Sequence, residues 1–242
     1  MLFHSTLEVD TFGPSQYGLG QLDSAVPNAR SDNSIAYKGT FNGVSVGATY
    51  SLGRDISAAG GPAATNCPGE SAANSSECRE WTALLRYDTA SWGISSGYSH
   101  MNGGATAAAG LNTSARSDSR LHVGAYAKLD SWKIGGGIIS RRNEGNPATP
   151  RSQLVYLGAA YRVTPLFAID GQIGRLDVKN SANDTSQFLL RGIYDLSKRT
   201  SVYVAGGRID NNGTAAVAIS AGGSVGAGLA QTGVITGIKH SF

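Results

Sequence analysis

The 242-residue sequence contains no apolar run of about 18 residues, the shortest that lets a helix cross a lipid bilayer. Charged residues make up only 15% of it, against about 25% in a soluble domain. The mean hydropathy is nevertheless only -0.15. Few charges without high hydropathy suit strands whose two faces differ in polarity. A transmembrane β-barrel has such strands, because only alternate residues face lipid.

The sequence also lacks a dense run of Lys and Arg. Its net charge is +3 and its basic residues are scattered, so no nucleic-acid partner is expected. HExxH, P-loop and paired-carboxylate motifs do not occur, and no G-x-S-x-G has a strand–turn–helix setting. We therefore expect no catalytic residue, no metal, no cofactor and no enzyme activity.

Cysteine is scarce, and both cysteines, Cys67 and Cys78, lie in one Gly/Ala/Ser-rich segment. A pair this close inside a loop predicts a disulfide formed in an oxidising compartment. The alternative is two free surface thiols. No CxxC or histidine spacing accompanies the pair, which argues against zinc.

Alternation of apolar and polar residues with period 2 is the repeated pattern, and it predicts β-strands. In 43–51 the apolar Val44, Val46 and Ala48 fall on one face, with Ser45 opposite. The predicted strands are 8–12 residues long, close to the 9–11 needed to cross a membrane at a tilt. Eleven strands are expected, near 33–39, 43–51, 81–88, 91–99, 120–129, 131–140, 153–162, 166–176, 186–196, 200–209 and 231–242.

Short and long connections alternate along the chain. The short ones contain the Asn, Asp, Ser, Gly or Pro of tight turns. Strict alternation places all tight turns at one end of the sheet and all long loops at the other, as in transmembrane barrels. The short connections are near 41–43, 88–91, 129–131, 163–165 and 196–199; the long ones are 52–79, 102–117, 142–151, 177–185 and 210–230.

Aromatic residues are predicted to gather near the tight turns, mostly on the apolar face. Such a group is typical of the aromatic girdle at a membrane interface. The alternative is a set of ordinary core aromatics. The residues concerned are Trp81, Tyr87, Trp92, Trp132, Tyr161, Phe167, Tyr194 and Phe242.

The C-terminal part carries a resemblance to a known family. YDLSKRTSVYV at 194–204 and the terminal TGIKHSF resemble the penultimate hairpin and last strand of general porins of β-proteobacteria. DNSIAYKGTFNGVSVGATYS at 32–51 is similar to the strand pair after the family's inward-folded third loop. The resemblance implies an all-β fold, an antiparallel transmembrane β-barrel.

Porins of the family that this chain resembles are trimers of 16-stranded barrels. The resemblance implies that the eleven strands predicted here match the last eleven of those sixteen. The resemblance implies a partial porin domain over 1–242, with the inward-folded constriction loop in 1–31 and strands in 32–242. The N-terminus, MLFHSTLEVD, has no signal-peptide features. We expect a truncated chain, and whether eleven strands close into a barrel is left open.

The resemblance also implies a function. We expect an outer-membrane porin of a Gram-negative cell, an integral membrane protein whose water-filled channel passes small hydrophilic solutes and ions. The expected partners are outer-membrane lipid and lipopolysaccharide, two further copies in a homotrimer, and the barrel-assembly machinery. Phe242, a terminal aromatic on the last strand, resembles the signal that this machinery reads.

In such a channel the chemistry lies on the polar face of the strands. Acidic groups of the third loop, here Glu8, Asp10 and Asp23, are expected to face basic wall residues across a narrow gap. Opposed charges there create a transverse field that orients polar solutes. The expected lumen-wall residues are Lys38, Arg86, His122, Lys128, Lys133, Asp170, Gln172, Arg191 and Lys239, with Asp170, Gln172 and Arg191 nearest mid-height.

Two other function classes are weighed against this one. A barrel that acts as an adhesin or surface receptor would bind through its long loops, and single-channel conductance separates it from a porin. A soluble β-sandwich lectin or enzyme would stay in the aqueous phase during detergent extraction. The segregated turns and the C-terminal motifs argue against the soluble class.

Overall fold

The structure, a computed structural model, describes residues 5–6, 9–13, 15–23, 31–56 and 65–242. It has one short 3-10 helix, η1 (Leu19–Gln21), and eleven strands. The strands are β1 (Ser34–Phe41), β2 (Val44–Ser51), β3 (Glu80–Asp88), β4 (Trp92–Asn102), β5 (Ser117–Leu129), β6 (Trp132–Asn143), β7 (Arg151–Thr164), β8 (Phe167–Val178), β9 (Thr185–Asp195), β10 (Thr200–Asn211) and β11 (Gln231–His240).

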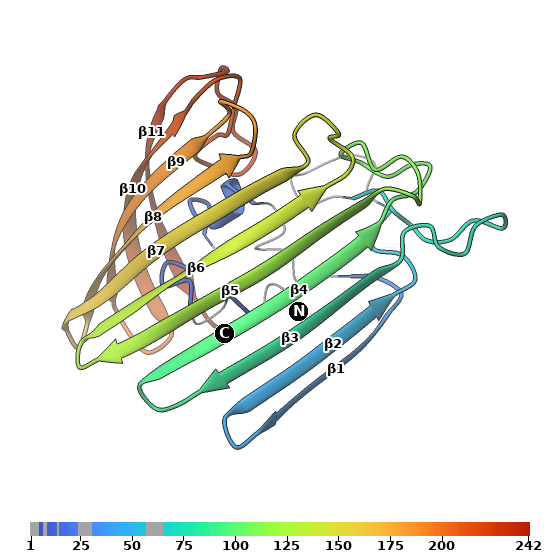
Figure 1. Ribbon diagram of the computed structural model, residues 1–242. Helices are drawn as coiled ribbons and strands as arrows, with labels where there is room; N and C mark the ends of the chain where they lie inside the picture. The colour runs from blue at the N-terminus through green and yellow to red at the C-terminus, as the bar shows by residue number, and fades with distance from the viewer. Residues whose placement is uncertain (1–4, 7–8, 14, 24–30, 57–64) are drawn as a thin grey trace.

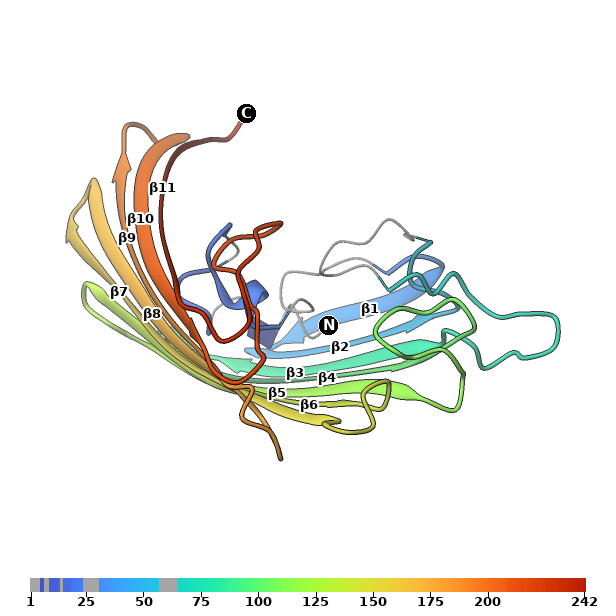
Figure 2. The ribbon, with the colours of Figure 1, turned by 90° about the horizontal axis from the view of Figure 1, so that it is seen from above.

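All eleven strands form one sheet in chain order, from β1 to β11. Each pair of neighbours is antiparallel, which confirms the predicted fold class. The sheet curves into a trough, and β1 and β11 are its two edges (Figures 1 and 2). Among the described residues, no helix has the length and apolar character that crossing a bilayer requires.

From β3 to β10 the predicted strands agree with the observed ones within two residues at the tight-turn ends and are one to three residues too short at the loop ends. β4 runs on to Asn102 and β5 begins at Ser117, three residues beyond each prediction. Near the loops both faces of the sheet are polar, so the alternation fades. The backbone ladder continues there because its hydrogen bonds do not depend on side-chain polarity.

The two faces of the sheet meet different surroundings. On the convex face, large apolar side chains such as Leu85, Leu121 and Ile173 are exposed by 44–59%. On the concave face their neighbours His122 and Leu189 are fully buried. An outside of exposed aliphatic side chains is stable when the surrounding medium is lipid.

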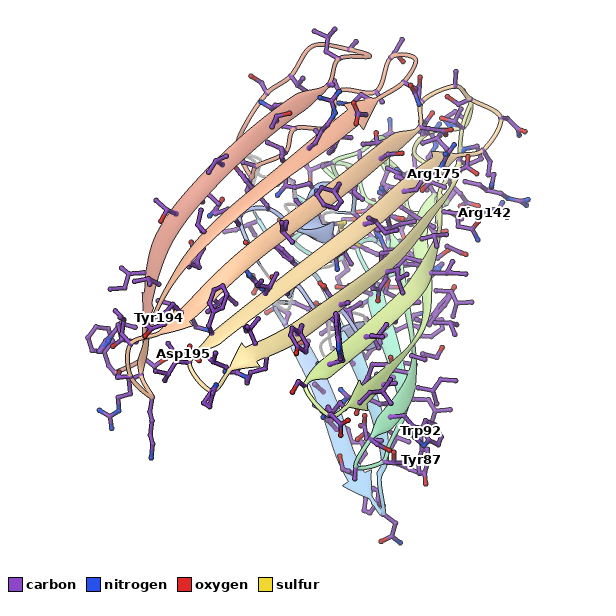
Figure 3. All side chains as sticks on the ribbon, turned by 90° about the vertical axis from the view of Figure 1, so that its left-hand side faces the viewer. Tyr87, Trp92, Arg142, Arg175, Tyr194 and Asp195 are labelled. Carbon is purple, nitrogen blue, oxygen red and sulfur yellow. A yellow bond between two sulfur atoms is a disulfide. The ribbon has the colours of Figure 1, made fainter. Side chains whose placement is uncertain are left out.

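Tight turns occupy one end of the sheet. At the β1–β2 turn Asn42 and Gly43 both have positive φ, 48° and 84°, the backbone that a two-residue hairpin requires. Asp130, in the β5–β6 turn, has φ 51°. In Figure 3 the strand ends that bear Tyr87 and Tyr194 lie opposite those that bear Arg142 and Arg175. The predicted segregation of turns and loops is present.

Aromatic pairs line the convex face at the tight-turn end. The rings of Tyr87 and Trp92 are 5.6 Å apart, and those of Trp132 and Tyr161 are 4.5 Å apart. Figure 3 shows Tyr87, Trp92 and Tyr194 at this end. Amphipathic rings in such a row match the level of lipid headgroups.

Trp81 does not belong to this row, so its predicted place is wrong. It is the second residue of β3, which starts at the end of a long loop. It pairs with Tyr50 and His100, and its ring lies 4.9 Å from that of Tyr98. The sheet therefore carries aromatic side chains at both ends, as a membrane with two interfaces favours.

Two long loops pack together at the other end. Cys67 and Cys78 form a disulfide inside the first loop. With Met101, Ala107 and Leu111 they make a small buried cluster separate from the main core. The backbone N–H of Cys78 donates to the carbonyl of Gly103 at 3.0 Å, so the disulfide holds one loop against the next.

Removing this disulfide is expected to free the loop and leave the sheet intact. For so short a closed loop the disulfide contributes about 2–3 kcal/mol, and its loss destabilises the folded loop rather than the sheet. Proteolysis within 65–79 of a Cys67→Ser/Cys78→Ser variant should be at least about tenfold faster than in the parent chain. The far-ultraviolet spectrum of the sheet should not change. A loop cleaved no faster than the parent's contradicts this, and a reductant added to the variant serves as the control.

Candidate functional site: the concave face

The described residues of 5–23 lie inside the trough, against the concave face of the sheet (Figure 2). Its side chains Val9, Phe12, Leu19 and Leu22 are buried. They form the main core with wall residues of β5–β10, among them Leu154, Tyr156, Leu189 and Ile209. The core thus sits between an inner segment and the wall, where a plain barrel would hold water. Below, "inner segment" means the described residues of 5–23.

Asp10 fastens the inner segment to β8. Its Oδ1 accepts hydrogen bonds from the N–H groups of Phe12 and Gly13, at 3.1 and 3.0 Å, and from Gln172 Nε2 at 2.6 Å. Burial raises the pKa of the Asp10 carboxyl, while these three hydrogen bonds act to lower it. Asp10 is 7% exposed and Gln172 is 3% exposed. The pair acts as a clasp rather than as a charge open to solutes.

Arg191 makes a second clasp. Its Nε donates to Asp170 Oδ1 at 3.0 Å, and its Nη2 donates to the carbonyl of Phe12 at 2.7 Å. The guanidinium also lies over the Phe12 ring, 4.1 Å from its centroid. Asp170 and Arg191 are cross-strand neighbours on β8 and β9. The two predicted wall charges therefore neutralise each other and hold the inner segment.

His122 is a third contact point and is fully buried. Its Nδ1 lies 2.8 Å from Ser5 Oγ, and its Nε2 lies 2.8 Å from Tyr156 Oη. Ser95, on β4, donates to the carbonyl of Ser5. The imidazole links the inner segment to the wall, and its burial keeps it from contact with solutes.

A buried group of ion pairs is centred on Arg120, a wall residue that was not predicted. Arg120 Nε donates to Asp23 Oδ2 at 2.9 Å, and its Nη1 donates to Asp118 Oδ2 at 3.0 Å. Asp118 in turn accepts from Arg141 Nη2 at 2.8 Å. Arg120, Asp23 and Asp118 are all at most 7% exposed. The expected acid–base opposition exists at Asp23, but the two groups touch and no gap separates them.

Two glycines give the inner segment room to approach the wall. Gly135 and Gly158 are direct cross-strand neighbours on β6 and β7. A Cβ on Gly135 would clash with the backbone carbonyl of Val9, and one on Gly158 would clash with Thr11 Oγ1. The backbone of 9–11 therefore rests on a part of the wall that has no side chains.

One long loop also folds inward, which the sequence analysis did not predict. Ile219, between β10 and β11, is 2% exposed and belongs to the main core. The N–H of Ala221 donates to the carbonyl of Gln16 at 3.4 Å. Figure 2 shows this red loop beside the blue inner segment. The trough is thus narrowed by two segments that are far apart in the sequence.

Basic side chains remain accessible on the concave face near the tight turns. Lys128 and Lys133 are cross-strand neighbours, and their ammonium groups lie 5.3 and 5.4 Å from the Tyr126 ring centroid. Arg86 pairs with Asp88, whose Oδ1 also accepts from Tyr126 Oη at 2.7 Å. These groups therefore lie at the tight-turn end of the concave face.

Lys38 and Lys239 lie on the same face by register. Lys38 pairs with Gly47, which pairs with the buried Leu84, and Lys239 pairs with Ser201. Both lysines are exposed. Within the described part of the chain, neither they nor Lys128 form an ion pair. The described arginines on concave-face strand positions all form ion pairs: Arg86, Arg120, Arg141, Arg162 and Arg191.

Of the two remaining predicted residues, the structure describes only Phe242. Phe242 follows the end of β11, fully exposed, with its ring 4.8 Å from that of His240. Glu8 lies outside the described residues. No three His, Cys, Asp or Glu side chains converge as metal ligands in the described ranges.

Known proteins share this fold. The structure resembles the anion-selective porin from Comamonas acidovorans with a TM-score of 0.66 at 21% identity, over 88% of this chain and 60% of that one. It resembles the trimer form of OmpT, an outer membrane protein of Vibrio cholerae, with a TM-score of 0.62 at 13% identity, over 99% and 74%. It resembles Salmonella typhi OmpF with a TM-score of 0.59 at 13% identity, over 87% of this chain and 65% of that one. No curated protein matches the sequence.

The chain spans 60% of the length of the Comamonas porin. Family and fold point to a channel rather than an enzyme. The family model for Gram-negative porins matches residues 3–214, most of the sequence. The chain therefore belongs to the Gram-negative porin family, as its terminal motifs predicted, and is an integral protein of the outer membrane.

Proposed function

We propose that this chain forms the wall of a water-filled channel for passive diffusion of small hydrophilic solutes, with a preference for anions. The inner segment narrows the channel and catalyses no reaction. Family membership supports the channel. The preference is supported by Lys38, Lys128 and Lys239 on the concave face, which form no ion pair with a described residue. The Comamonas relative, which is described as anion-selective, has the same fold.

The preference follows from which charges stay free. Asp23 and Asp170 are buried in ion pairs with Arg120 and Arg191, and Asp10 is buried in hydrogen bonds to Gln172 and the backbone, so none of the three carboxylates is open to solutes. Lys38 and Lys128 are exposed and form no ion pair with a described residue. Free cations along a low-dielectric wall raise the local concentration of anions.

The homotrimer and the assembly signal belong to the same proposal. A trimer form is known for the Vibrio OmpT relative. The exposure of Phe242, just beyond the last strand, supports its role as the signal that the assembly machinery binds. Removing Phe242 should then lower the amount of protein that reaches the outer membrane and leave the conductance of each refolded channel unchanged.

Reversal potential in a planar bilayer tests the channel and its preference together. Under a KCl gradient we expect the reversal potential to have the sign of the chloride equilibrium potential. A Lys38→Glu/Lys128→Glu/Lys239→Glu variant should lower the anion-to-cation permeability ratio by about tenfold or more. The control is Lys198→Glu, an exposed cation in the β9–β10 turn.

Each result has a definite meaning. If the triple variant conducts with an unchanged permeability ratio, the lysines do not set the preference, and the channel proposal still stands. The absence of stepwise conductance would disprove the channel and favour a surface protein that binds through its long loops.

A further inference from the structure

The two segments that fold into the trough carry no charge where they meet. Residues 11–22 and residues 212–230, the loop between β10 and β11, contain no Asp, Glu, Lys, Arg or His. The acidic residues that flank 11–22 are Asp10 and Asp23, and both are buried in contact with wall residues. The inward segments therefore present an uncharged surface in a trough whose wall carries free lysines.

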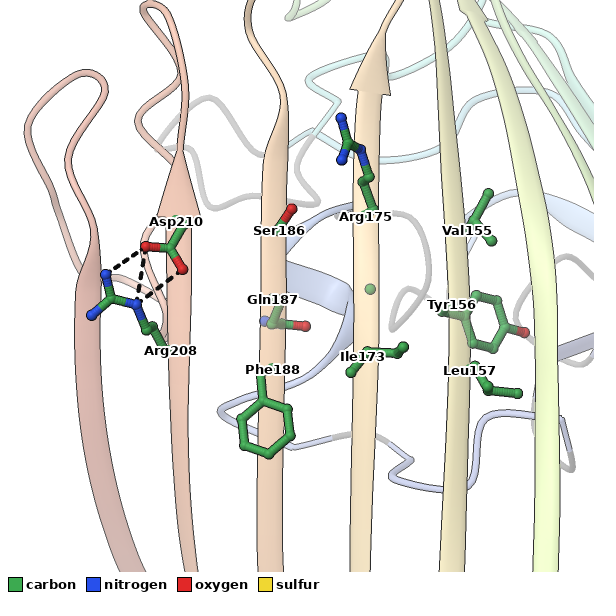
Figure 4. Close-up of a pocket in the computed structure, with 11 residues that line it drawn as sticks. Val155, Tyr156, Leu157, Ile173, Arg175, Ser186, Gln187, Phe188, Arg208 and Asp210 are labelled. Atoms are coloured by element: carbon green, nitrogen blue, oxygen red, sulfur yellow. Dashed lines mark hydrogen bonds and ion pairs between the residues drawn. The ribbon is translucent and has the colours of Figure 1, made fainter.

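The strands on either side of this loop keep their charges out of the trough at the loop end. Arg208 and Asp210, the last charged residues of β10, pair with each other at 2.7 Å (Figure 4). They lie on the outward face, because Arg208 is the direct cross-strand neighbour of the exposed Phe188. On β11 the first charged residue is Lys239, next to the last residue of the strand. Neither strand therefore places a charge beside the loop on the concave face.

Buried contacts fix the loop in its inward position. The Asn211 side chain, at the end of β10, donates to the carbonyl of Val217 at 3.0 Å and accepts from its N–H at 3.1 Å. Ile219 packs on Gly207 and Gly233, which are cross-strand neighbours. A Cβ on either glycine would lie 3.2–3.3 Å from the Ile219 side chain. The uncharged loop is thus a fixed part of the trough.

An exposed patch forms where the loop touches the inner segment. The N–H of Ala221 donates to the carbonyl of Gln16, and both residues are exposed. Gly222 and Gly223 beside them are exposed as well. Figure 2 shows both segments inside the trough. The patch offers solutes a methyl group, glycine backbone and one neutral amide, and no carboxylate.

An inward surface without carboxylates changes which solutes a lysine-bearing wall favours. Opposed charges across a narrow gap orient the water between them, and an apolar solute has to displace that water. Among the described residues of the inward segments, no exposed carboxylate faces Lys38 or Lys128. The lysines still attract an anionic group. An apolar group on the same solute is stabilised when it covers the uncharged patch.

We infer that the channel favours small organic anions that carry an apolar group, such as aromatic carboxylates, over anions of equal size that are more polar. The lysines attract the carboxylate, and the apolar ring passes along Gln16 and residues 221–223. Gln16 and Ala221 are therefore specificity-determining residues. This inference depends on the proposed channel and names the class of solute that the channel prefers.

Reversal potentials under bi-ionic conditions, with the refolded full chain in a planar bilayer, test this preference. The probes are benzoate and nicotinate, which have the same shape and differ by a ring nitrogen in place of one C–H group. For the parent we expect a benzoate permeability at least about threefold that of nicotinate. A Gln16→Glu/Ala221→Asp variant adds two carboxylates to the patch and should bring the ratio to about one.

The matched control is Ala221→Asn. With the native Gln16 it has the same side-chain shapes as the charged variant and lacks only the two charges, so it should keep the parent's ratio within about 1.5-fold. Both positions are exposed, and the chloride conductance of each variant shows that it has folded. An equal fall of the ratio in the charged variant and in its control would show that charge at the patch does not set the preference.

Chloride currents in the same bilayers separate this inference from the proposed channel. A parent that conducts chloride and passes nicotinate as readily as benzoate would overturn the inference and leave the channel standing. A parent that never conducts chloride would overturn the channel, and the inference with it. A charged variant that keeps the parent's benzoate-to-nicotinate ratio would overturn the roles of Gln16 and Ala221.

Discussion

Replacing Arg120 by methionine is expected to cost far more stability than replacing Asp23, its partner on the inner segment. Arg120 touches two buried carboxylates, Asp23 at 2.9 Å and Asp118 at 3.0 Å. Its loss leaves Asp118 with Arg141 and removes the Arg120 contact of the buried Asp23. Breaking a buried ion pair from one side costs about 3–5 kcal/mol, because the remaining charge stays desolvated.

The Asp23→Asn variant keeps more of the contact. Arg120 still has Asp118 at 3.0 Å, and the asparagine oxygen can accept its Nε–H. We expect a loss of about 1–2 kcal/mol, the value of a charge-assisted hydrogen bond that becomes neutral. The Arg120→Met/Asp23→Asn double variant should recover part of the larger loss, with a coupling energy of about 1–3 kcal/mol.

Urea unfolding of the refolded protein, followed by tryptophan fluorescence, measures these free energies. The control is Arg162→Met, which breaks an exposed ion pair with Asp195 that is worth about 0–1 kcal/mol. Equal losses for Arg120→Met and Asp23→Asn would show that the contact with two carboxylates does not stabilise the trough. Additive losses in the double variant would show that Arg120 and Asp23 are not coupled.

The strands and the face that each residue occupies could be predicted because both depend on local rules. Alternation sets which side of a strand a side chain points to, and short turns set which strands pair. All nine predicted lumen-wall residues lie on the concave face for this reason. The strand ends and the place of Trp81 were predicted less well, since they depend on where the apolar band stops.

The contacts of the site could not be predicted in the same way. Whether Asp10 meets water or Gln172 depends on how closely the inner segment approaches β8. Alternation places Arg120 on the same face as His122, yet nothing local shows that Asp23, 97 residues away, comes to meet it. The inward fold of the loop that carries Ile219 is also a long-range packing effect.

Adding side chains at the two wall glycines is expected to lift the inner segment from the wall without unfolding the sheet. In a Gly135→Ala/Gly158→Ala variant, one new methyl group meets the carbonyl of Val9 and the other meets the Thr11 hydroxyl. Thr11 can rotate away, but a backbone carbonyl cannot, so Gly135 has the larger effect. Overpacking of this kind costs about 1–3 kcal/mol.

The strain from the added methyl groups is relieved by moving the inner segment, because moving the wall would break more hydrogen bonds. β6 and β7 are each hydrogen-bonded on both sides, so moving the wall disrupts two ladders. Moving residues 9–11 strains the Asp10–Gln172 and Phe12–Arg191 clasps but disrupts no strand ladder. The contact of Asp23 with Arg120 lies farther along the chain and should keep the end of the inner segment in place.

Hydrogen exchange measures the release peptide by peptide. Amides in 9–13 should exchange about 5- to 150-fold faster in the double variant, the factor that corresponds to about 1–3 kcal/mol, while those of β6 and β7 stay protected. Gly206→Ala is the matched control, because a Cβ there meets no atom closer than 3.8 Å and should change nothing. Faster exchange in the strands themselves would mean that the wall yields before the inner segment does. Unchanged exchange in 9–13 would show that this segment does not rest on the two glycines.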